Sequence, residues 1–281
     1  MHATRSALTV ATLCACLASC APWPIGPEAA LVRTVPGVAT TASECVAALQ
    51  GSPSDVVQGL ATPIELLSWN VQKGRQANWR ADLRELSDGK AFVALQELVL
   101  EAGVAADLPH LEYMAFSQGY TTRSKTTGVA TFSANPPLTE CRLSAVEPLL
   151  RTPKATSIAE YALQAHAQTL LVVNLHAVNF TLGLKEFATQ IEQIREVLEA
   201  HDGPAVLGGD FNTWSRRRMR IVDALVDDLG FSDIPLAKDS RKTFNGNPLD
   251  HVFTRGFSAV SARSTVVRSS DHNPVAVELT L

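Results

Sequence analysis

Hydrophobic residues from Ile64 onward fall into short runs that alternate with longer stretches of helical spacing. Short runs rich in branched apolar side chains predict buried β-strands. The clearest helix is 184–200, where apolar side chains recur every three or four residues. The pattern predicts strands at 64–70, 92–97, 128–133, 170–176, 205–208, 249–253 and 275–279, and helices at 79–86, 184–200 and 215–229.

Strands interspersed with helices indicate sheets covered by helices, so we expect a layered α+β or α/β domain. Apolar residues make up 46% and charged residues 19% of the 281 residues, which permits a large core and argues against wholesale disorder. The sequence has no repeat of solenoid period. The formal net charge of −4 provides no global positive field for nucleic acid, but it excludes neither a local basic groove nor phosphate chemistry.

The N-terminus has the pattern of a targeting segment. Arg5 precedes an apolar run at 7–17 that is too short to be a stable membrane anchor. The run ends in Leu-Ala-Ser-Cys at 17–20, which resembles the lipobox of bacterial lipoproteins, where the cysteine becomes the lipidated first residue. A plain secretory signal is the alternative. The resemblance implies lipidation of Cys20 and a lipid-anchored place in the cell envelope, at the outer membrane or in the periplasm, with secreted or cytoplasmic locations as alternatives.

The remaining chain divides into two parts. After the signal peptide at 1–19, residues 20–62 are rich in Pro, Ala and Thr and are predicted to form a tether or N-terminal extension, with the folded domain at 63–281. Cys45 and Cys141 remain after processing, and an oxidising compartment would allow them to pair. Since sequence gives no distance between them, two unpaired thiols are the open alternative.

Polar side chains capable of metal binding or proton transfer stand at strand ends or loop starts, where layered folds carry catalytic groups. A single acidic residue in such a place is usually a turn former, but six such places favour a shared site. Carboxylate and amide oxygens suit Mg²⁺, Mn²⁺ or Ca²⁺, and the few cysteines argue against structural zinc. The residues are Asn70, Glu97, Asn174, His176, Asp210, Asn212, Asp250, Asp271 and His272.

Several short motifs stand in the order found in the endonuclease/exonuclease/phosphatase superfamily, which the chain resembles from about Ile64 to Leu281. That superfamily includes abasic-site endonucleases, secreted deoxyribonucleases, neutral sphingomyelinases and inositol-polyphosphate 5-phosphatases. Within it the chain is similar to the YafD-like bacterial branch. The motifs are Trp69-Asn70, Gln96-Glu97, Asn174-Leu175-His176, Gly209-Asp210-Phe211-Asn212, Leu249-Asp250 and Ser270-Asp271-His272-Asn273-Pro274.

The resemblance implies a four-layer αββα sandwich, in which two packed mixed sheets are flanked by helices and the site lies at one rim. It also implies a metal held mainly by Glu97, with Asn70 supporting the metal or a phosphate oxygen and Asp271 as a further metal or water contact. Asp210, with Asn212 beside it, would orient and deprotonate the attacking water.

The resemblance further implies that His272 contacts the scissile phosphate, with its tautomer set by Asp250. His176 would stabilise the phosphate or protonate the leaving group. Asn174 and Arg123 are candidate substrate contacts, although the loop of Arg123 is equally compatible with an exposed turn. The arginines that follow the Gly-Asp-Phe-Asn motif could reach substrate phosphates or form a solvated helix face; they are Arg216, Arg217, Arg218 and Arg220.

The resemblance, together with oxygen ligands that suit Mg²⁺, Mn²⁺ or Ca²⁺, implies a divalent-metal-dependent hydrolase of phosphate esters. A monomeric phosphodiesterase acting on nucleic acid is the first expectation. The alternatives are a phospholipid or sphingolipid phosphodiesterase, or a phosphomonoesterase, at a membrane reached through the lipid anchor. A catalytically silent surface lipoprotein that acts as a binding module is the non-enzymatic alternative, and the intact set of motif residues speaks against it.

Overall fold

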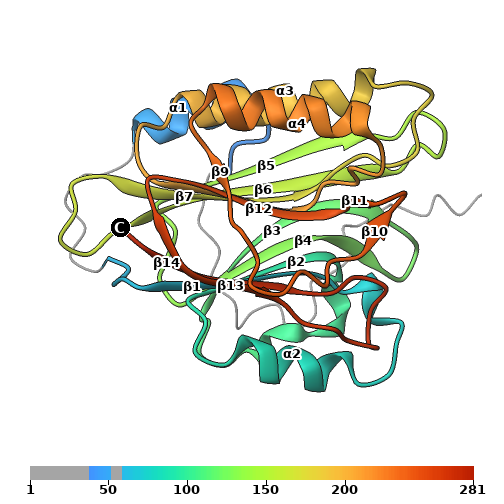
Figure 1. The fold of residues 1–281 in the computed structure, drawn as a ribbon, viewed down its shortest axis with the longest axis horizontal. Helices are drawn as coiled ribbons and strands as arrows, with labels where there is room; N and C mark the ends of the chain where they lie inside the picture. Colours follow the sequence, from blue (N-terminus) through green and yellow to red (C-terminus); the bar gives the residue numbers. More distant parts are fainter. Residues whose placement is uncertain (1–37, 52–58) are drawn as a thin grey trace, which may run out of the picture.

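The computed structural model describes residues 38–51 and 59–281, and within them two six-stranded sheets pack face to face (Figure 1). The predicted signal peptide, Cys20 and most of the predicted tether lie outside the described residues. The elements are α1 (Ala42–Gln50), β1 (Ile64–Asn70), α2 (Trp79–Ser87), β2 (Phe92–Val99), β3 (Tyr113–Thr121), β4 (Thr126–Ser133), β5 (Thr139–Val146), β6 (Pro153–Ala162), β7 (Thr169–His176), α3 (Lys185–Glu199), β8 (Ala205–Asp210), α4 (Arg216–Asp228), β9 (Ser232–Asp233), β10 (Thr243–Phe244), β11 (Asn247–Pro248), β12 (Asp250–Arg255), β13 (Ser258–Ser264) and β14 (Val275–Thr280).

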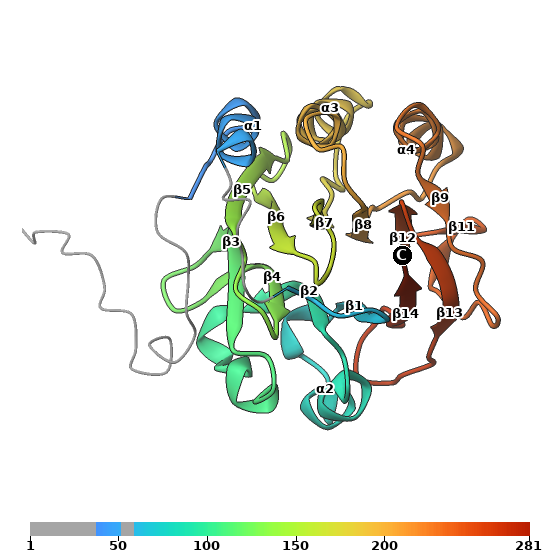
Figure 2. The same ribbon diagram turned by 90° about the vertical axis from the view of Figure 1, so that its left-hand side faces the viewer.

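The first sheet has the order β13-β14-β1-β2-β4-β3, in which β1 and β2 are parallel and the other neighbours are antiparallel. Helix α2 covers its outer face (Figure 2). The apolar side of this amphipathic helix, including Leu83, packs against Trp69, Val93 and Leu95 from the strands. Burial of that side supplies most of the stability of so short a helix.

The second sheet has the order β5-β6-β7-β8-β12-β9, with β7 and β8 parallel. Helices α1, α3 and α4 lie on its outer face (Figures 1 and 2). Along β7, Leu171 and Val173 pack toward these helices, while Leu170 and Val172 pack between the two sheets. A strand buried on both faces has no polar alternation, which explains the continuous apolar run in this part of the sequence. The predicted four-layer αββα sandwich is confirmed.

The segment before the domain differs from the expected tether. Residues 42–50 form helix α1, which begins with a capping box between Thr41 and Glu44 and buries Ala42, Cys45 and Leu49 on one side. Cys45 forms a disulfide with Cys141 of β5 across a Cα–Cα distance of 5.6 Å. Of the two alternatives predicted for 20–62, a tether or an N-terminal extension, residues 42–50 fit only the extension, because their apolar side chains recur at helical spacing and pack against β5 and α3. Within residues 38–51 and 59–281, no helix is long and apolar enough to cross a membrane.

Candidate active site

Strand direction brings the polar motifs to one edge of the sandwich. Asn70 ends β1 beside the parallel β2, and His176 ends β7 beside Asp210 at the end of the parallel β8. Strand β12 runs antiparallel to β8, so its first residue, Asp250, pairs with Asp210. In Figure 1 this edge lies opposite the C-terminus. Residues as far apart in the sequence as Asn70 and His272 therefore meet at one edge.

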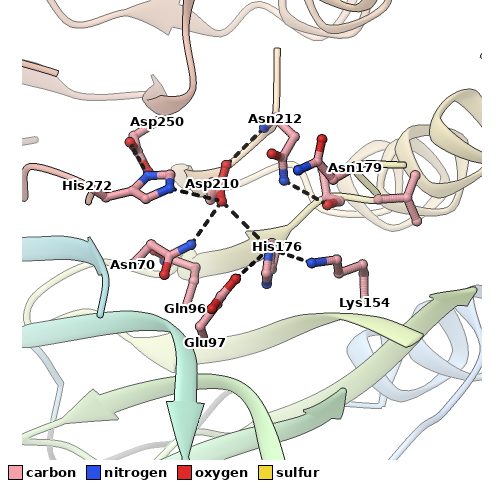
Figure 3. Close-up of polar contacts among 12 residues, drawn as sticks. Asn70, Gln96, Glu97, Lys154, His176, Asn179, Asp210, Asn212, Asp250 and His272 are labelled. Atoms are coloured by element: carbon pink, nitrogen blue, oxygen red, sulfur yellow. Dashed lines mark hydrogen bonds and ion pairs between the residues drawn. The ribbon is translucent and has the colours of Figure 1, made fainter. Parts of the chain in front are cut away.

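Several of the polar side chains at this edge surround Asp210, and we call this group the cluster (Figure 3). The buried carboxylate of Asp210 accepts a hydrogen bond from the Asn70 amide at 2.9 Å and from the backbone N–H of Asn212 at 3.0 Å. The Nε2 atoms of His176 and His272 lie 3.6 and 3.8 Å from Oδ2 of Asp210. Burial raises the pKa of Asp210 to about 6, against the opposing effect of His272. A carboxylate with a pKa near neutrality is suited to taking a proton from water.

His272 lies between two carboxylates. Its Nδ1 atom is 2.8 Å from Oδ2 of Asp250, and its Nε2 atom faces Asp210. Burial alone would lower the pKa of His272, but Asp250 and Asp210 together outweigh burial and raise the pKa to about 10. The ring is thus an imidazolium at neutral pH, positioned to neutralise charge on a bound phosphate.

The loop that carries His272 is fixed to β1. The Trp69 indole N–H donates to the carbonyl of His272 at 3.1 Å. The Ser270 hydroxyl donates to the carbonyl of Asn70 at 2.6 Å and accepts from the backbone N–H of His272 at 3.1 Å. These bonds orient the imidazole independently of any ligand. Asp271, in contrast, is exposed and accepts a hydrogen bond from Gln72 at 2.8 Å, so the structure places it at the rim of the cluster.

Glu97 reaches the site through an irregularity in β2. The register between β2 and β4 shifts between Leu95 and Leu98, and Glu97 has a φ of 54°, in the left-handed region. Such a conformation costs about 1–3 kcal/mol and concentrates at functional sites, and a bulge re-aims a side chain. The Glu97 carboxylate forms an ion pair with Lys73 and lies 3.8 Å from Nε2 of His176.

His176 is held as a neutral ring. Burial lowers its pKa well below the ordinary value, and Lys154, His272 and Lys73 lower it further. Lys154 Nζ lies 2.9 Å from Nε2 of His176. Because an ammonium only donates, Nε2 is the acceptor and the ring proton is on Nδ1. Sequence reasoning missed Lys154, which lies in β6, a strand that the hydrophobic pattern did not predict.

Two predicted substrate contacts are not brought into the cluster. Asn174 is a correction: its side chain is fully buried between the sheets, accepts from Gln96 at 2.7 Å and donates to the carbonyl of Ala130 at 3.0 Å. Asn174 therefore links β7 to the strands of the other sheet, and its buried side chain does not reach a substrate. Arg123 lies in the exposed turn between β3 and β4, and among the described residues no polar contact joins its side chain to Asp210 or its neighbours.

Arg218 departs from both predicted alternatives, since its side chain neither faces solvent nor reaches the cluster around Asp210. Its buried guanidinium donates to the carbonyls of Val178 at 2.6 Å, Asn179 at 2.8 Å and Asn212 at 3.1 Å. It also stacks over the rings of Phe187 and Trp214. Arg218 thus fixes the loops after β7 and β8 to each other. Arg216, Arg217 and Arg220 are exposed.

The donor set fits a hard divalent cation. One group of potential ligands, Asp210, Asp250 and His272, places one atom from each residue within 4.8 Å of the others. However, His272 is engaged by both carboxylates and is protonated, so it offers no lone pair. The carboxylate of Glu97 and the side-chain oxygen of Asn70 are ligands of the kind that Mg²⁺ prefers. The Glu97 carboxylate already has a cationic partner, because the ammonium of Lys73 forms an ion pair with it.

Comparison with known proteins agrees with this geometry. The sequence pattern of the endonuclease/exonuclease/phosphatase family matches residues 67–272, which span the cluster from β1 to His272. The chain belongs to this family. A UPF0294 protein of Vibrio vulnificus (strain YJ016) is 37% identical over 220 residues, which cover 78% of this chain and 77% of the relative. The family and its solved members support a phosphoester hydrolase.

Solved structures share the fold at low identity. Sphingomyelinase C from Streptomyces griseocarneus superimposes with a TM-score of 0.55 at 18% identity, covering 78% of this chain and 99% of that chain. Danio rerio TDP2, solved with a single-strand DNA product, gives a TM-score of 0.56 at 15% identity, covering 78% of this chain and 100% of that chain. At such identities the likeness establishes the shared fold and not the substrate.

Proposed function

We propose that the protein is a divalent-metal-dependent phosphodiesterase in which Asp210 activates the attacking water. One observation supports the proposal most directly. The amide of Asn70, the neutral imidazole of His176 and the imidazolium of His272 all lie against the buried carboxylate of Asp210. A silent binding module would not need a base with a pKa near neutrality beside a charged histidine. The same convergence favours catalysis over binding alone.

Glu97 and Asn70 would hold the cation, with Asp210 adjacent to them. When bound, a divalent cation withdraws charge from a non-bridging phosphate oxygen. Mg²⁺ is the first candidate, and Mn²⁺ or Ca²⁺ are alternatives, because all the proposed ligands are oxygens. Asp271 at the rim is a candidate for contact through water.

The protein residues divide the proton transfers between them. Asp210 takes a proton from water as the water oxygen attacks phosphorus, and the bond from phosphorus to the leaving oxygen breaks on the opposite side. His272, held by Asp250, neutralises the charge that builds up on the phosphate. The leaving oxygen takes its proton from the pair formed by Lys154 and His176, since the ammonium is the proton carrier in that pair.

A substrate panel with and without a chelator tests the proposal. Full-length protein is incubated with plasmid DNA, RNA, phospholipid, sphingomyelin, a soluble diester and a soluble monoester, each with Mg²⁺ or with EDTA. We expect chelator-sensitive release of product from a diester. Hydrolysis that persists after complete metal removal, or no hydrolysis of any ester by the loaded protein, would overturn the proposal.

We also propose a place in the cell envelope, reached through lipidation of Cys20, with the protein acting as a monomer. The disulfide between Cys45 and Cys141 supports an oxidising compartment, because such bonds persist mainly outside the cytosol. Metabolic labelling with a fatty acid, compared between the natural chain and Cys20→Ser, tests the anchor. Equal labelling of both proteins would contradict it.

A further inference from the structure

Exposed apolar side chains gather on the loops beside the active site. Leu149 and Leu150 lie in the turn between β5 and β6, and Phe180 and Leu182 lie in the loop that follows His176. Each is more than half exposed, and Leu182 is 85% exposed. Phe244 at the end of β10 is similarly exposed. We call these five residues the apolar rim. Scattered exposed leucines need no explanation, but a group on adjoining loops marks an interaction surface.

A buried carboxylate joins the first two loops of the apolar rim. Glu147, two residues before Leu149 in the sequence, is almost fully buried. Its Oε1 atom accepts from the backbone N–H groups of Asn179 at 2.7 Å and Phe180 at 3.3 Å, and its Oε2 atom accepts from the Thr152 hydroxyl at 2.6 Å. The leucines of one loop and the phenylalanine of the other are therefore presented together by a preorganised scaffold.

The third loop is tied to the same scaffold. The indole N–H of Trp214 donates to the side-chain oxygen of Asn179 at 3.0 Å, and the Asn247 amide donates to the carbonyl of Trp214 at 3.3 Å. Asn247 pairs with Phe244 across the β10–β11 hairpin. The apolar rim consequently follows the active-site edge from β6 through β8 to the hairpin before β12.

The apolar rim and the site share chain segments. The strand after the Leu149–Leu150 turn carries Lys154, and Phe180 lies four residues after His176 in the loop that follows β7. Lys154 and His176 contact each other at 2.9 Å. Figure 3 shows Lys154, His176 and Asn179 on the same side of Asp210. A surface that receives the apolar rim would thus lie against the entrance to the phosphate site.

Basic side chains flank the apolar rim. Arg151 follows Leu150 directly, Lys185 begins α3 where the Leu182 loop ends, and Arg216 and Arg217 begin α4; all four are exposed. Aliphatic and aromatic residues surrounded by Lys and Arg are typical of surfaces that enter the headgroup region of an anionic bilayer. The three leucines of the apolar rim can neither stack on bases nor hydrogen-bond to them, and only its two phenylalanines offer a stacking face, so nucleic acid fits this surface less well than a bilayer does.

We propose that the apolar rim docks on an anionic phospholipid bilayer and presents the active site to the phosphodiester of a lipid headgroup. This inference rests on the proposed function for its chemistry, whereas the docking itself depends only on the surface. Leu149, Leu150, Phe180, Leu182 and Phe244 enter the boundary between headgroups and acyl chains, and Arg151, Lys185, Arg216 and Arg217 pair with lipid phosphates.

Sedimentation with vesicles tests the docking. All proteins carry Cys20→Ser, so that the predicted acyl chain contributes nothing, and the vesicles contain phosphatidylglycerol and phosphatidylcholine in equal parts. The test variant is Leu150→Ser/Leu182→Ser, and the control is Leu281→Ser, an exposed leucine at the opposite end of the sandwich. We expect the test variant to bind about tenfold more weakly or worse, and the control to bind like the parent.

A soluble diester separates the two proposals. Hydrolysis of bis(4-nitrophenyl) phosphate should be unchanged in Leu150→Ser/Leu182→Ser, while hydrolysis of the vesicle phospholipid should fall in parallel with binding. Equal vesicle binding by the test variant and the parent would overturn the docking proposal even if the diester is cleaved. Normal docking without cleavage of either diester would instead overturn the proposed function. Cleavage of DNA with no lipid cleavage would reject the lipid as substrate.

Discussion

Oδ2 of Asp250 lies 2.8 Å from Nδ1 of His272, and this contact sets the charge of the ring that faces Asp210. The two residues come from different structural elements, one from the start of β12 and the other from the loop before β14. Asp250 is itself buried, so its charge acts on the imidazole with little screening by solvent. The site therefore uses one buried acid to keep a histidine charged and another to accept a proton.

Asp250→Asn should lower turnover of a soluble diester by about 10–100-fold, because an amide orients the ring less well and removes the charge that favours the imidazolium. Since the pKa of His272 is raised to about 10, activity in the natural protein should fall only as pH rises toward that value. In the variant this alkaline loss should begin at lower pH. A pH–rate profile measures both effects, and an unmoved alkaline limb would contradict the assigned role of Asp250.

Lys154→Met should lower kcat by about 100-fold or more, since it removes the ammonium that bonds to His176. Because Lys154 also lowers the pKa of His176, the substitution should raise that pKa, which histidine NMR can follow. Lys238→Met, at an exposed lysine, is the control for loss of charge. An effect of equal size in both variants would show that Lys154 acts only through net charge.

His251 should make the fold sensitive to acid. Its side chain points away from the cluster, lies 2.8 Å from the Thr213 hydroxyl and is buried, and burial lowers its pKa to about 4. The unfolded chain then binds the proton more tightly than the folded chain. Stability is full above pH 6.5 and falls by roughly 3 kcal/mol as pH drops toward 4. Denaturant unfolding of His251→Gln should show a smaller loss across that range, and an identical pH dependence would refute the role.

Arg218→Lys should destabilise the protein by about 3–5 kcal/mol, because a single ammonium cannot satisfy the carbonyls of Val178, Asn179 and Asn212 in a buried place. Arg217→Lys is the matched control at an exposed neighbour and should change stability by less than about 0.5 kcal/mol. Urea unfolding at neutral pH measures both. Similar midpoints for the two variants would contradict a structural role for Arg218.

The sequence allowed prediction of the elements with a strong apolar signal. Strand 64–70 agrees with β1, and the helix predicted at 184–200 agrees with α3 within one residue at each end. Strand β5 was missed because its polar residues break the apolar pattern, and its outer part is exposed at the sheet edge. Helix α1 was missed because the Pro-, Ala- and Thr-rich composition of residues 20–62 predicted a tether, and because sequence alone does not show the disulfide that fixes this short helix to β5.

The sequence motifs predicted most of the residues in the cluster around Asp210. They predicted less well whether a residue on a strand lies at the exposed edge or between the sheets. Asn174 shares a strand face with His176 but lies two residues, or about 6–7 Å, deeper between the sheets. The continuous apolar run of β7 on either side of Asn174 could have indicated this burial. Lys154 could not be found, because its importance comes only from the packing of β6 beside β7. Positive φ at Glu97 likewise has no signal in the sequence.

The role of Asp210 is tested most directly by measuring hydrolysis of bis(4-nitrophenyl) phosphate by the natural protein and by Asp210→Asn, each depleted of metal and then reloaded with Mg²⁺. We expect Mg²⁺ to restore activity to the natural protein alone. The variant should stay folded, because burial raises the pKa of this carboxyl to about 6, so that its charge at pH 7 disfavours the folded state and an uncharged amide does not. Turnover by Asp210→Asn close to that of the natural protein, or activity in the natural protein without metal, would contradict this mechanism.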